Sequence, residues 1–232
     1  MAIRIMKVAI LQPNYLPWKG VFDMINKVDF FVFLDDVQYT KHDWRNRNKI
    51  KTPNGLRWIT VPVKSNSIKQ KINEVEVSQR VNWQKKHYNS FIANYSKAKY
   101  FKDFEFLLED FYITNKWKKL SDLDIYTTIK ISEILRINTN FLKSSEFKIK
   151  EKDKNRRLIE IIKLLKGKIY ITGPSAKNYL NIELFEKNGI EVRFMEYKYP
   201  EYQQLYEGFI HEVTVLDVLF NCGDRSPFYI FT

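Results

Sequence analysis

The strongest constraint on the fold is a strand, a helix and a second strand within the first 34 residues. Residues 7–11 form a short β-branched apolar run, and apolar residues recur at helical spacing over residues 17–28. Residues 30–34 form a second apolar run between two aspartates, typical of a strand buried on both faces. Because a crossover of this kind joins parallel strands, the sequence predicts a βαβ unit and a parallel sheet.

The rest of the chain extends this pattern and interrupts it once. Three helical patterns of aromatic and aliphatic residues lie between residues 82 and 137. Elsewhere we expect strands at 57–63, 75–77, 141–143, 169–172 and 192–195, and helices at 153–165 and 213–220, the last ended by Gly223. We therefore predict one α/β domain over residues 1–232: a mainly parallel, Rossmann-like sheet with flanking helices and a helical insertion at about 82–137.

Composition excludes several classes of protein. Hydrophobic residues make up 44% of the 232 positions and charged residues 28%, so the chain can form a core and is not disordered. Seven glycines include no GxGxxG or GxxxxGK[ST] pattern, and Cys222 alone allows neither an intramolecular disulfide nor a cysteine-based zinc site. No signal-peptide pattern or membrane-length apolar run is present, so we expect a cytoplasmic protein without a bound structural metal.

The charge balance is basic, with 39 Lys and Arg against 27 Asp and Glu, a net charge of +12. A basic surface favours anionic partners such as phosphate-bearing small molecules, nucleic acid or an acidic membrane face. The abundance of Lys, Asn and Ile is also typical of A/T-biased coding. We interpret the surplus mostly as such a background, with a local basic segment superimposed on it.

That local segment, residues 35–51, follows the second strand and is the densest polar run in the chain. Ligands of open α/β sheets bind at the carboxyl ends of parallel strands, so Gln12 and Asn14 after the first strand should face the same crevice. Asp35, Asp36 and His42 are the candidate catalytic residues, because a carboxylate or imidazole can act as general base. Paired carboxylates could instead bind a divalent ion or simply cap a turn.

The same segment supplies candidate binding residues. Arg45 and Arg47 offer bidentate phosphate donors beside the stacking surface of Trp44, a combination that suits a nucleotide or a nucleic acid and is also found on exposed strands. Ser144, Ser145 and Gly173 follow later strands and lead into helix N-termini, where anions bind. The full set of candidate binding residues is Gln12, Asn14, Trp18, Gln38, Trp44, Arg45, Arg47, Asn48, Ser144, Ser145 and Gly173.

The chain resembles the WbqC-like protein family. The stretches that carry the resemblance are residues 9–20 (AILQPNYLPWKG), 33–39 (FLDDVQY), 43–50 (DWRNRNKI), 53–55 (PNG) and 60–63 (TVPV), with Ser144-Ser145, residues 199–203 and residues 216–223 further along. Proteins of this family are similar to products of surface-polysaccharide gene clusters, often beside aminotransferases that make nucleotide-linked amino sugars. The resemblance implies this setting and assigns no catalytic residues.

We therefore expect an O-antigen biosynthesis enzyme that transfers an acyl or aminoacyl group to the amine of a nucleotide-linked sugar. Trp44, Arg45 and Arg47 would hold the nucleotide, and Asp35 or Asp36 would take a proton from the ammonium. Gln12, Asn14 and Gln38 would orient the sugar or stabilise the oxyanion. The cofactor is open, an acyl donor being one possibility; nucleic acid is not an expected partner, and the oligomeric state, a homo-oligomer included, is open as well.

Two alternatives remain at this point. The order of strand, Pro-containing loop, Trp18-Lys19-Gly20 and second strand is similar to that of HIGH-motif nucleotide-binding enzymes, which suggests a ligase that uses ATP and Mg²⁺. A non-catalytic binding or assembly factor is the other, because the chain has no recognisable catalytic triad or metal motif.

Overall fold

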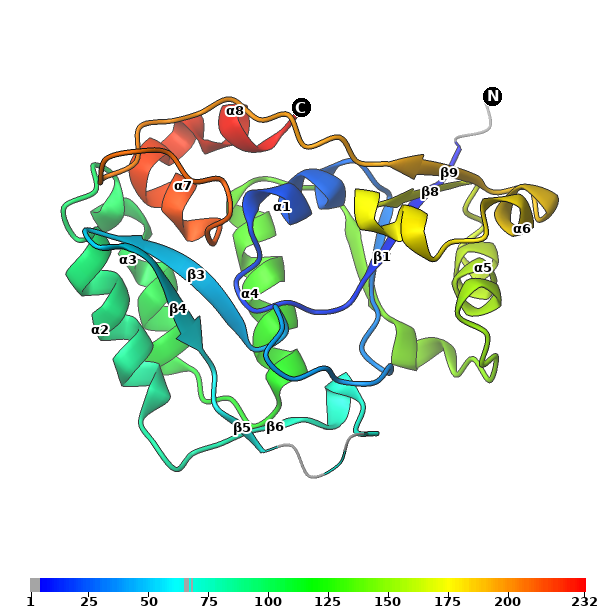
Figure 1. Ribbon diagram of the computed structural model, residues 1–232, viewed down its shortest axis with the longest axis horizontal. Helices are drawn as coiled ribbons and strands as arrows, with labels where there is room; N and C mark the ends of the chain where they lie inside the picture. Colours follow the sequence, from blue (N-terminus) through cyan, green and yellow to red (C-terminus); the bar gives the residue numbers. More distant parts are fainter. Residues whose placement is uncertain (1–4, 65–66, 68) are drawn as a thin grey trace.

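The computed structural model describes residues 5–64, 67 and 69–232 and is built around a five-stranded parallel sheet (Figure 1). The strands lie in the order β7-β2-β1-β8-β9, and every neighbouring pair is parallel. Their bounds are β1 Lys7–Leu11, β2 Phe30–Phe33, β7 Asn140–Lys143, β8 Ile169–Thr172 and β9 Glu191–Phe194. The predicted α/β fold with a parallel sheet is confirmed.

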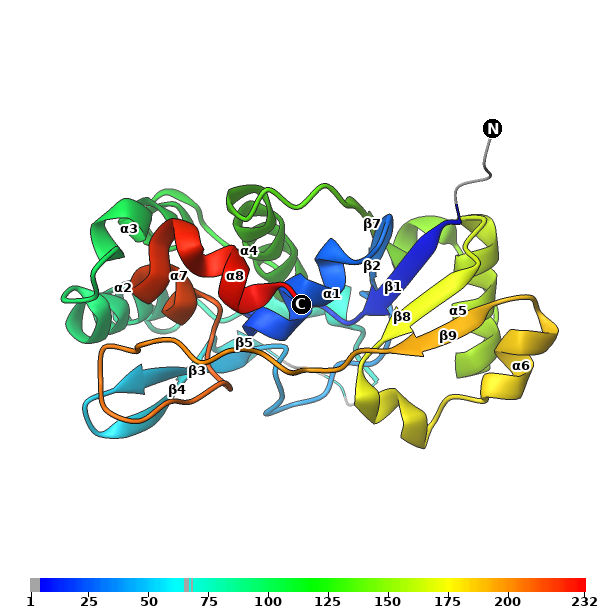
Figure 2. The same cartoon turned by 90° about the horizontal axis from the view of Figure 1, so that it is seen from above.

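Helices cover both faces of this sheet, as Figure 2 shows. Alternation along β1 turns Val8 and Ile10 toward α5 (Lys154–Leu164) and α6 (Ile182–Lys187), while Ala9 faces the side of α1 (Lys19–Asn26). The chain ends in α7 (Leu216–Cys222) and α8 (Ser226–Ile230) on the α1 side, with short 3₁₀ turns at Ile72–Glu74, Ser144–Phe147, Pro174–Asn178 and Gly223–Arg225. Gly223 has a φ of 58°, a left-handed conformation that glycine adopts easily, and it ends α7 as expected.

The helical segment predicted at about 82–137 is present. It contains α2 (Trp83–Tyr95), α3 (Phe101–Glu109), a π-helical turn (Asp110–Thr114) and α4 (Leu120–Ile134). These helices lie beside the sheet and pack against α7, where Phe220 meets three aromatic rings of α2 and α3 at centroid distances of 5.0 to 6.3 Å. No helix within the described ranges is long and apolar enough to cross a membrane.

The strand expected at 57–63 lies outside the parallel sheet. It is found as β4 (Gly55–Thr60), paired antiparallel with β3 (Arg47–Thr52), and the next residues form β5 (Val63–Lys64), which pairs with β6 (Glu76–Val77). The predicted turn explains the hairpin, because Pro53-Asn54 and a Gly55 with a φ of 94° bring the two strands together locally. The basic run is therefore a hairpin strand beside the sheet.

Candidate functional site

The strand order brings the predicted segments to one edge of the sheet. From β1 the sheet grows through β2 and β7 on one side and through β8 and β9 on the other. The segments that follow these strands thus meet at the carboxyl edge, where open α/β sheets bind ligands. Two neighbouring groups of predicted residues lie there, one around Asp35 and one around Arg45.

In the first group, Asp35 is surrounded by hydrogen-bond donors. Its side chain is 2% exposed and accepts hydrogen bonds from the Ser144 hydroxyl at 3.1 Å, the Ser145 amide at 3.0 Å and the Ser145 hydroxyl at 2.8 Å. The side-chain amide of Asn73 also donates to Oδ2 of Asp35 at 3.4 Å. These bonds join the ends of β2 and β7, which is the capping role that was the alternative to catalysis.

Asp36 is held in a similar way. One of its oxygens accepts from the Ser144 hydroxyl, whose single proton is shared between Asp35 and Asp36, and the other accepts from the guanidinium of Arg157 on α5 at 2.5 Å. Both partners of this ion pair are about 15% exposed, so solvent screens it only partly. The contacts of Asp35 and Asp36 favour a structural role, and the hypothesis that either takes a proton stays a prediction.

In the second group, Arg45 connects the loop after β1 to the polar segment. Its guanidinium donates to the Gln12 side chain and forms an ion pair with Asp43 at 2.9 Å. The Trp44 carbonyl accepts the backbone amide of Tyr15 at 2.9 Å. Burial lowers the pKa of Arg45, an effect that the nearby carboxylates oppose. The predicted neighbours Gln12 and Arg45 are therefore in direct contact.

Asn48 supports this loop from β3. Its side-chain amide donates to the carbonyls of Tyr15, at 3.2 Å, and Leu16, at 2.6 Å. Leu16 has a φ of 42°, in the left-handed region that non-glycine residues rarely adopt. Asn48 is 3% exposed and stabilises this turn, so it supports the site through the backbone.

Beside Arg45, two tryptophans and two cations form an exposed surface that we call the tryptophan platform. Its residues are Trp44, Trp58, Arg47 and Lys49. The rings of Trp44 and Trp58 are 42% and 41% exposed, with centroids 5.3 Å apart. The Arg47 guanidinium lies 4.2 Å from the Trp58 centroid, and Lys49 Nζ lies 5.2 Å from it. Sequence reasoning missed Trp58, which lies in the strand expected at 57–63, because the pairing that places it opposite Lys49 was not predicted.

Two predicted residues in the polar segment point elsewhere. His42 is exposed, has a φ of 57° and contributes its backbone carbonyl to the Arg47 guanidinium. Gln38 is exposed and forms an isolated β-bridge with Lys71. Both residues therefore make these contacts through their backbone groups. A catalytic role for the His42 ring stays a prediction.

Trp18 and Gly173 lie on the β8–β9 side of the edge. The Trp18 ring covers Gly20 so closely that a Cβ there would come within 2.3 Å of it, and it packs edge-on against Tyr197 at 4.8 Å. A Cβ on Gly173 would lie 3.4 Å from the Tyr197 hydroxyl. These residues pack the start of α1 against the segment after β9, apart from the Arg45 group.

Lys19 follows Trp18 and is buried with its charge covered by aromatic rings. Its ammonium lies 5.0 to 5.5 Å from the ring centroids of Tyr199, Tyr202 and Phe209, and the lysine is 2% exposed. Burial lowers its pKa to about 8, opposed by the acidic groups nearby. Cation–π contacts of this kind stabilise a buried ammonium, and they connect α1 to the segment before α7.

Asp124 is a second residue that sequence reasoning missed. It lies on α4, is 0% exposed, and neither carboxylate oxygen has a hydrogen-bond partner among the described residues. Its charge raises the pKa of Tyr15, Tyr39 and Arg45, three residues of the segments that follow β1 and β2. Burial raises the pKa of Asp124 well above its ordinary value, and Arg45 opposes this rise. A carboxylate in this state is a stronger proton acceptor than that of an ordinary aspartate.

The other buried aspartates show how unusual this is. Asp217 accepts hydrogen bonds from two tyrosine hydroxyls and a glutamine amide, and Asp23 accepts them from a lysine, a tyrosine and a threonine. With Asp35, these are the four buried aspartates of the described ranges. Because an unpartnered buried carboxylate is costly, Asp124 stands out as a group available to a ligand.

A chain of hydrogen bonds fixes the wall next to Asp124. The Tyr15 hydroxyl bonds Nδ1 of His87 at 2.8 Å and is also bonded to the Tyr112 hydroxyl, while Nε2 of His87 lies 3.2 Å from the Thr60 carbonyl. Since a carbonyl only accepts, Nε2 carries the proton and Nδ1 accepts from Tyr15. Burial lowers the pKa of His87 to about 4, so the ring is neutral and structural at neutral pH.

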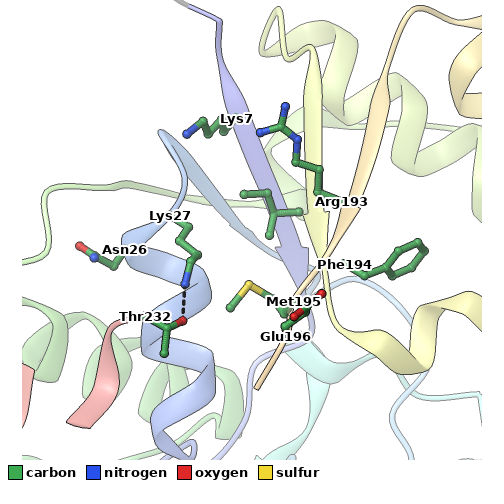
Figure 3. Close-up of a pocket in the computed structure, with 9 residues that line it drawn as sticks. Lys7, Asn26, Lys27, Arg193, Phe194, Met195, Glu196 and Thr232 are labelled. Carbon is green, nitrogen blue, oxygen red and sulfur yellow. Dashed lines mark hydrogen bonds between the residues drawn. The ribbon is translucent and has the colours of Figure 1, made fainter. Parts of the chain in front are cut away.

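Surface pockets lie away from these groups. Figure 3 shows one of about 500 Å³, lined by residues that include Lys7, Lys27 and Arg193, between the end of α1 and β9. A second, of about 520 Å³, lies between α5 and α6. Neither is lined by a predicted site residue. Lys27 pairs with Asp23 and Arg193 with Glu191, so two of the three cations in Figure 3 are already neutralised.

The fold and the carboxyl-edge groups together define an α/β protein with a Rossmann-like parallel sheet and a basic hairpin beside it. A sequence model of the WbqC-like protein family matches residues 12–228, so the chain belongs to the WbqC-like protein family, as the resemblance predicted. It is also 39% identical over 226 residues, 97% of each chain, to a Mycobacterium tuberculosis (strain ATCC 25618 / H37Rv) protein named "Uncharacterized protein Rv1507c". No solved structure matches the chain.

Proposed function

We propose that the protein is an enzyme of surface-polysaccharide biosynthesis that modifies the amine of a nucleotide-linked amino sugar by acyl or aminoacyl transfer. The sugar nitrogen forms a bond to the carbonyl carbon of an activated donor, for example a thioester. The carbon–sulfur bond breaks and the thiolate leaves. Of the two protons that the ammonium loses in becoming an amide, a carboxylate of the protein takes one before the attack and the departing thiolate takes the other. The family resemblance supports the setting, and the exposed tryptophans with their neighbouring cations support a nucleotide-linked substrate.

The tryptophan platform is the observation that carries this proposal. Half-exposed Trp44 and Trp58 offer ring faces on which a nucleobase can stack, and Arg47 and Lys49 lie over the same rings to neutralise a diphosphate. Base stacking on aromatic side chains contributes about 1–3 kcal/mol per base. A stacking surface with two cations at its centre suits one nucleotide.

The position of the platform gives the sugar a direction. Trp44 is bonded through its carbonyl to Tyr15, and Arg45 next to it contacts Gln12. A diphosphate on Arg47 and Lys49 would therefore send the attached sugar toward the loop after β1. Gln12 and Asn14 stand there as proposed sugar-orienting residues.

Isothermal titration calorimetry with UDP, dTDP, their hexose conjugates, ATP with Mg²⁺ and a thymidine oligonucleotide tests the proposal. We expect micromolar or tighter binding of a nucleoside diphosphate sugar, weakened at least tenfold by Trp58→Ala and unchanged by Trp117→Phe, a buried tryptophan elsewhere. Binding of ATP with Mg²⁺ alone would instead support the ligase alternative. Binding of the oligonucleotide alone, with a steep salt dependence, would refute the proposal and make the platform a nucleic-acid surface.

A further inference from the structure

The polar atoms around Asp124 are mostly acceptors. Buried atoms without partners in the described residues include both oxygens of Asp124, Oδ1 of Asn14 and Oδ1 of Asn46, which are acceptors, and Nε of Arg45, which is a donor. The Tyr39 hydroxyl, also unpartnered, can accept or donate. A ligand that satisfies these atoms has to bring several hydrogen-bond donors.

The charges of the site point to a cation. Arg45 already forms an ion pair with Asp43 at 2.9 Å, so it compensates the charge of an ionised, buried Asp124 only in part. No group of three or more His, Cys, Asp or Glu side chains in the described part of the chain could hold a metal ion. A primary ammonium, with one positive charge and three N–H donors, matches both requirements.

Arg45 connects Asp124 with the side of the molecule where a ligand would arrive. Asp124 itself is covered, but Arg45, whose charge acts on it, has a side chain that is 17% exposed, and Gln12, which Arg45 contacts, is half-buried. Arg45 also directly follows Trp44, the first ring of the platform, in the sequence. An amine on a sugar that extends from the platform would approach Asp124 from the side of Arg45.

We propose that Asp124 binds the ammonium group of a primary amine substrate and takes one proton from it, which leaves a neutral amine and a carboxylic acid. This inference rests on the proposed function for the identity of the amine as an amino sugar. Burial already raises the pKa of Asp124, so its carboxylate is a stronger proton acceptor than that of an ordinary aspartate. Tyr39 and Tyr15 face the same carboxyl group and help to orient the ammonium.

The test compares UDP-glucosamine, which carries a primary amine, with UDP-glucose and UDP by calorimetry. For the wild type we expect UDP-glucosamine to bind roughly 10- to 100-fold more tightly than UDP-glucose, the range for hydrogen bonds to a charged group. Asp124→Asn should abolish this preference and leave the affinity for UDP within about twofold of wild type. Asp122→Asn, at an exposed position on the same helix, should keep it.

Tyr39→Phe provides a second variant in case Asp124→Asn fails to fold. It removes one unpartnered hydroxyl, and we expect it to reduce the preference for the amine severalfold with UDP binding unchanged. An amine preference that survives Asp124→Asn, or a wild type without any preference, would overturn the inference. If UDP and UDP-glucose do not bind at all, the proposed function fails, and glucosamine against glucose then tests Asp124 by itself.

Discussion

Asp35 and Asp124 are both buried carboxylates that belong to the same edge of the molecule, yet their surroundings are opposite. Asp35 is 2% exposed and receives hydrogen bonds from two serines and an asparagine. Asp124 is 0% exposed and receives none from the described residues. A carboxylate with a full set of donors stabilises the fold, whereas one without them lowers stability until something binds to it.

This difference separates two functions that the sequence had combined in one polar segment. The Asp35 group joins the ends of β2 and β7 and extends through Asp36 to Arg157 on α5. The Arg45 group joins the loop after β1 to the tryptophan platform and faces Asp124. The first group builds the edge of the sheet, and the second offers chemistry at that edge.

The largest effect is expected at Asp35. Replacing it with alanine removes the acceptor of several buried donors, so we expect a loss of about 3–5 kcal/mol in the free energy of unfolding. Urea denaturation of Asp35→Ala measures it, with Asp122→Ala as the exposed control. A variant as stable as wild type would show that the Asp35 group does not hold the edge, and would restore Asp35 as a candidate base.

His87 next to Asp124 should make stability depend on pH. Its pKa of about 4 in the folded state lies below the ordinary value of 6.5, so the unfolded chain takes up a proton first as the pH falls. Stability is therefore lost between about pH 6.5 and pH 4, by about 3 kcal/mol in all.

The comparison of wild type with His87→Gln isolates this contribution, since glutamine can both donate to Thr60 and accept from Tyr15 without titrating in this range. Thermal unfolding at several pH values measures the difference, which should shrink as the pH falls. A difference that stays constant from pH 7 to pH 4 would mean that His87 is not held neutral.

Arg47→Lys tests whether the tryptophan platform binds the phosphates of a nucleotide through the guanidinium of Arg47. The guanidinium stacks on Trp58 and can hold a phosphate with two parallel hydrogen bonds, which lysine cannot reproduce. We expect nucleotide affinity to fall by about 1.5–3 kcal/mol although the charge is kept. Calorimetry with UDP measures the loss, and Arg57→Lys on the exposed neighbouring position of β4 is the control. An unchanged affinity in Arg47→Lys, which keeps the positive charge, would indicate a general electrostatic surface.

Asp124→Asn should have the smallest effect on stability, and with the opposite sign. The raised pKa of Asp124 means that the unfolded chain ionises first as the pH rises, so wild type loses stability from about pH 4 upward. Asparagine does not titrate, and the variant should be about 1 kcal/mol more stable than wild type at pH 8 and nearly equal at pH 4. Melting temperatures across this range test it; a variant less stable at pH 8 would mean that the carboxylate has a partner.

The sequence predicted the parallel sheet and the helical segment because both depend on local periodicity. Apolar runs over residues 7–11 and 30–34 and the aromatic repeats after residue 82 are visible along the chain. The separate hairpin was not foreseen, although its turn was, because the choice of pairing partner is decided by tertiary contacts. Asn48, which holds the turn at Leu16, is one such contact.

The predicted site was incomplete for a similar reason. Residues near Arg45 were found because they follow strand ends, where ligands bind in such sheets. Asp124 lies some eighty residues further along and reaches the site only when α4 packs against the loops after β1 and β2. Its signal was one acidic residue between Leu123 and Ile125, on a helix face that is otherwise buried.

The most direct test of the central claim is the titration of the Asp124 carboxyl itself, followed by the ¹³Cγ chemical shift in labelled protein and assigned by its absence in Asp124→Asn. We expect the carboxyl group to titrate well above the ordinary range of aspartate without ligand, because burial disfavours its charge. Saturation with UDP-glucosamine should lower its pKa, because an ammonium stabilises the carboxylate, while UDP-glucose should not. An ordinary pKa without ligand, or the same pKa with both sugars, would contradict the account.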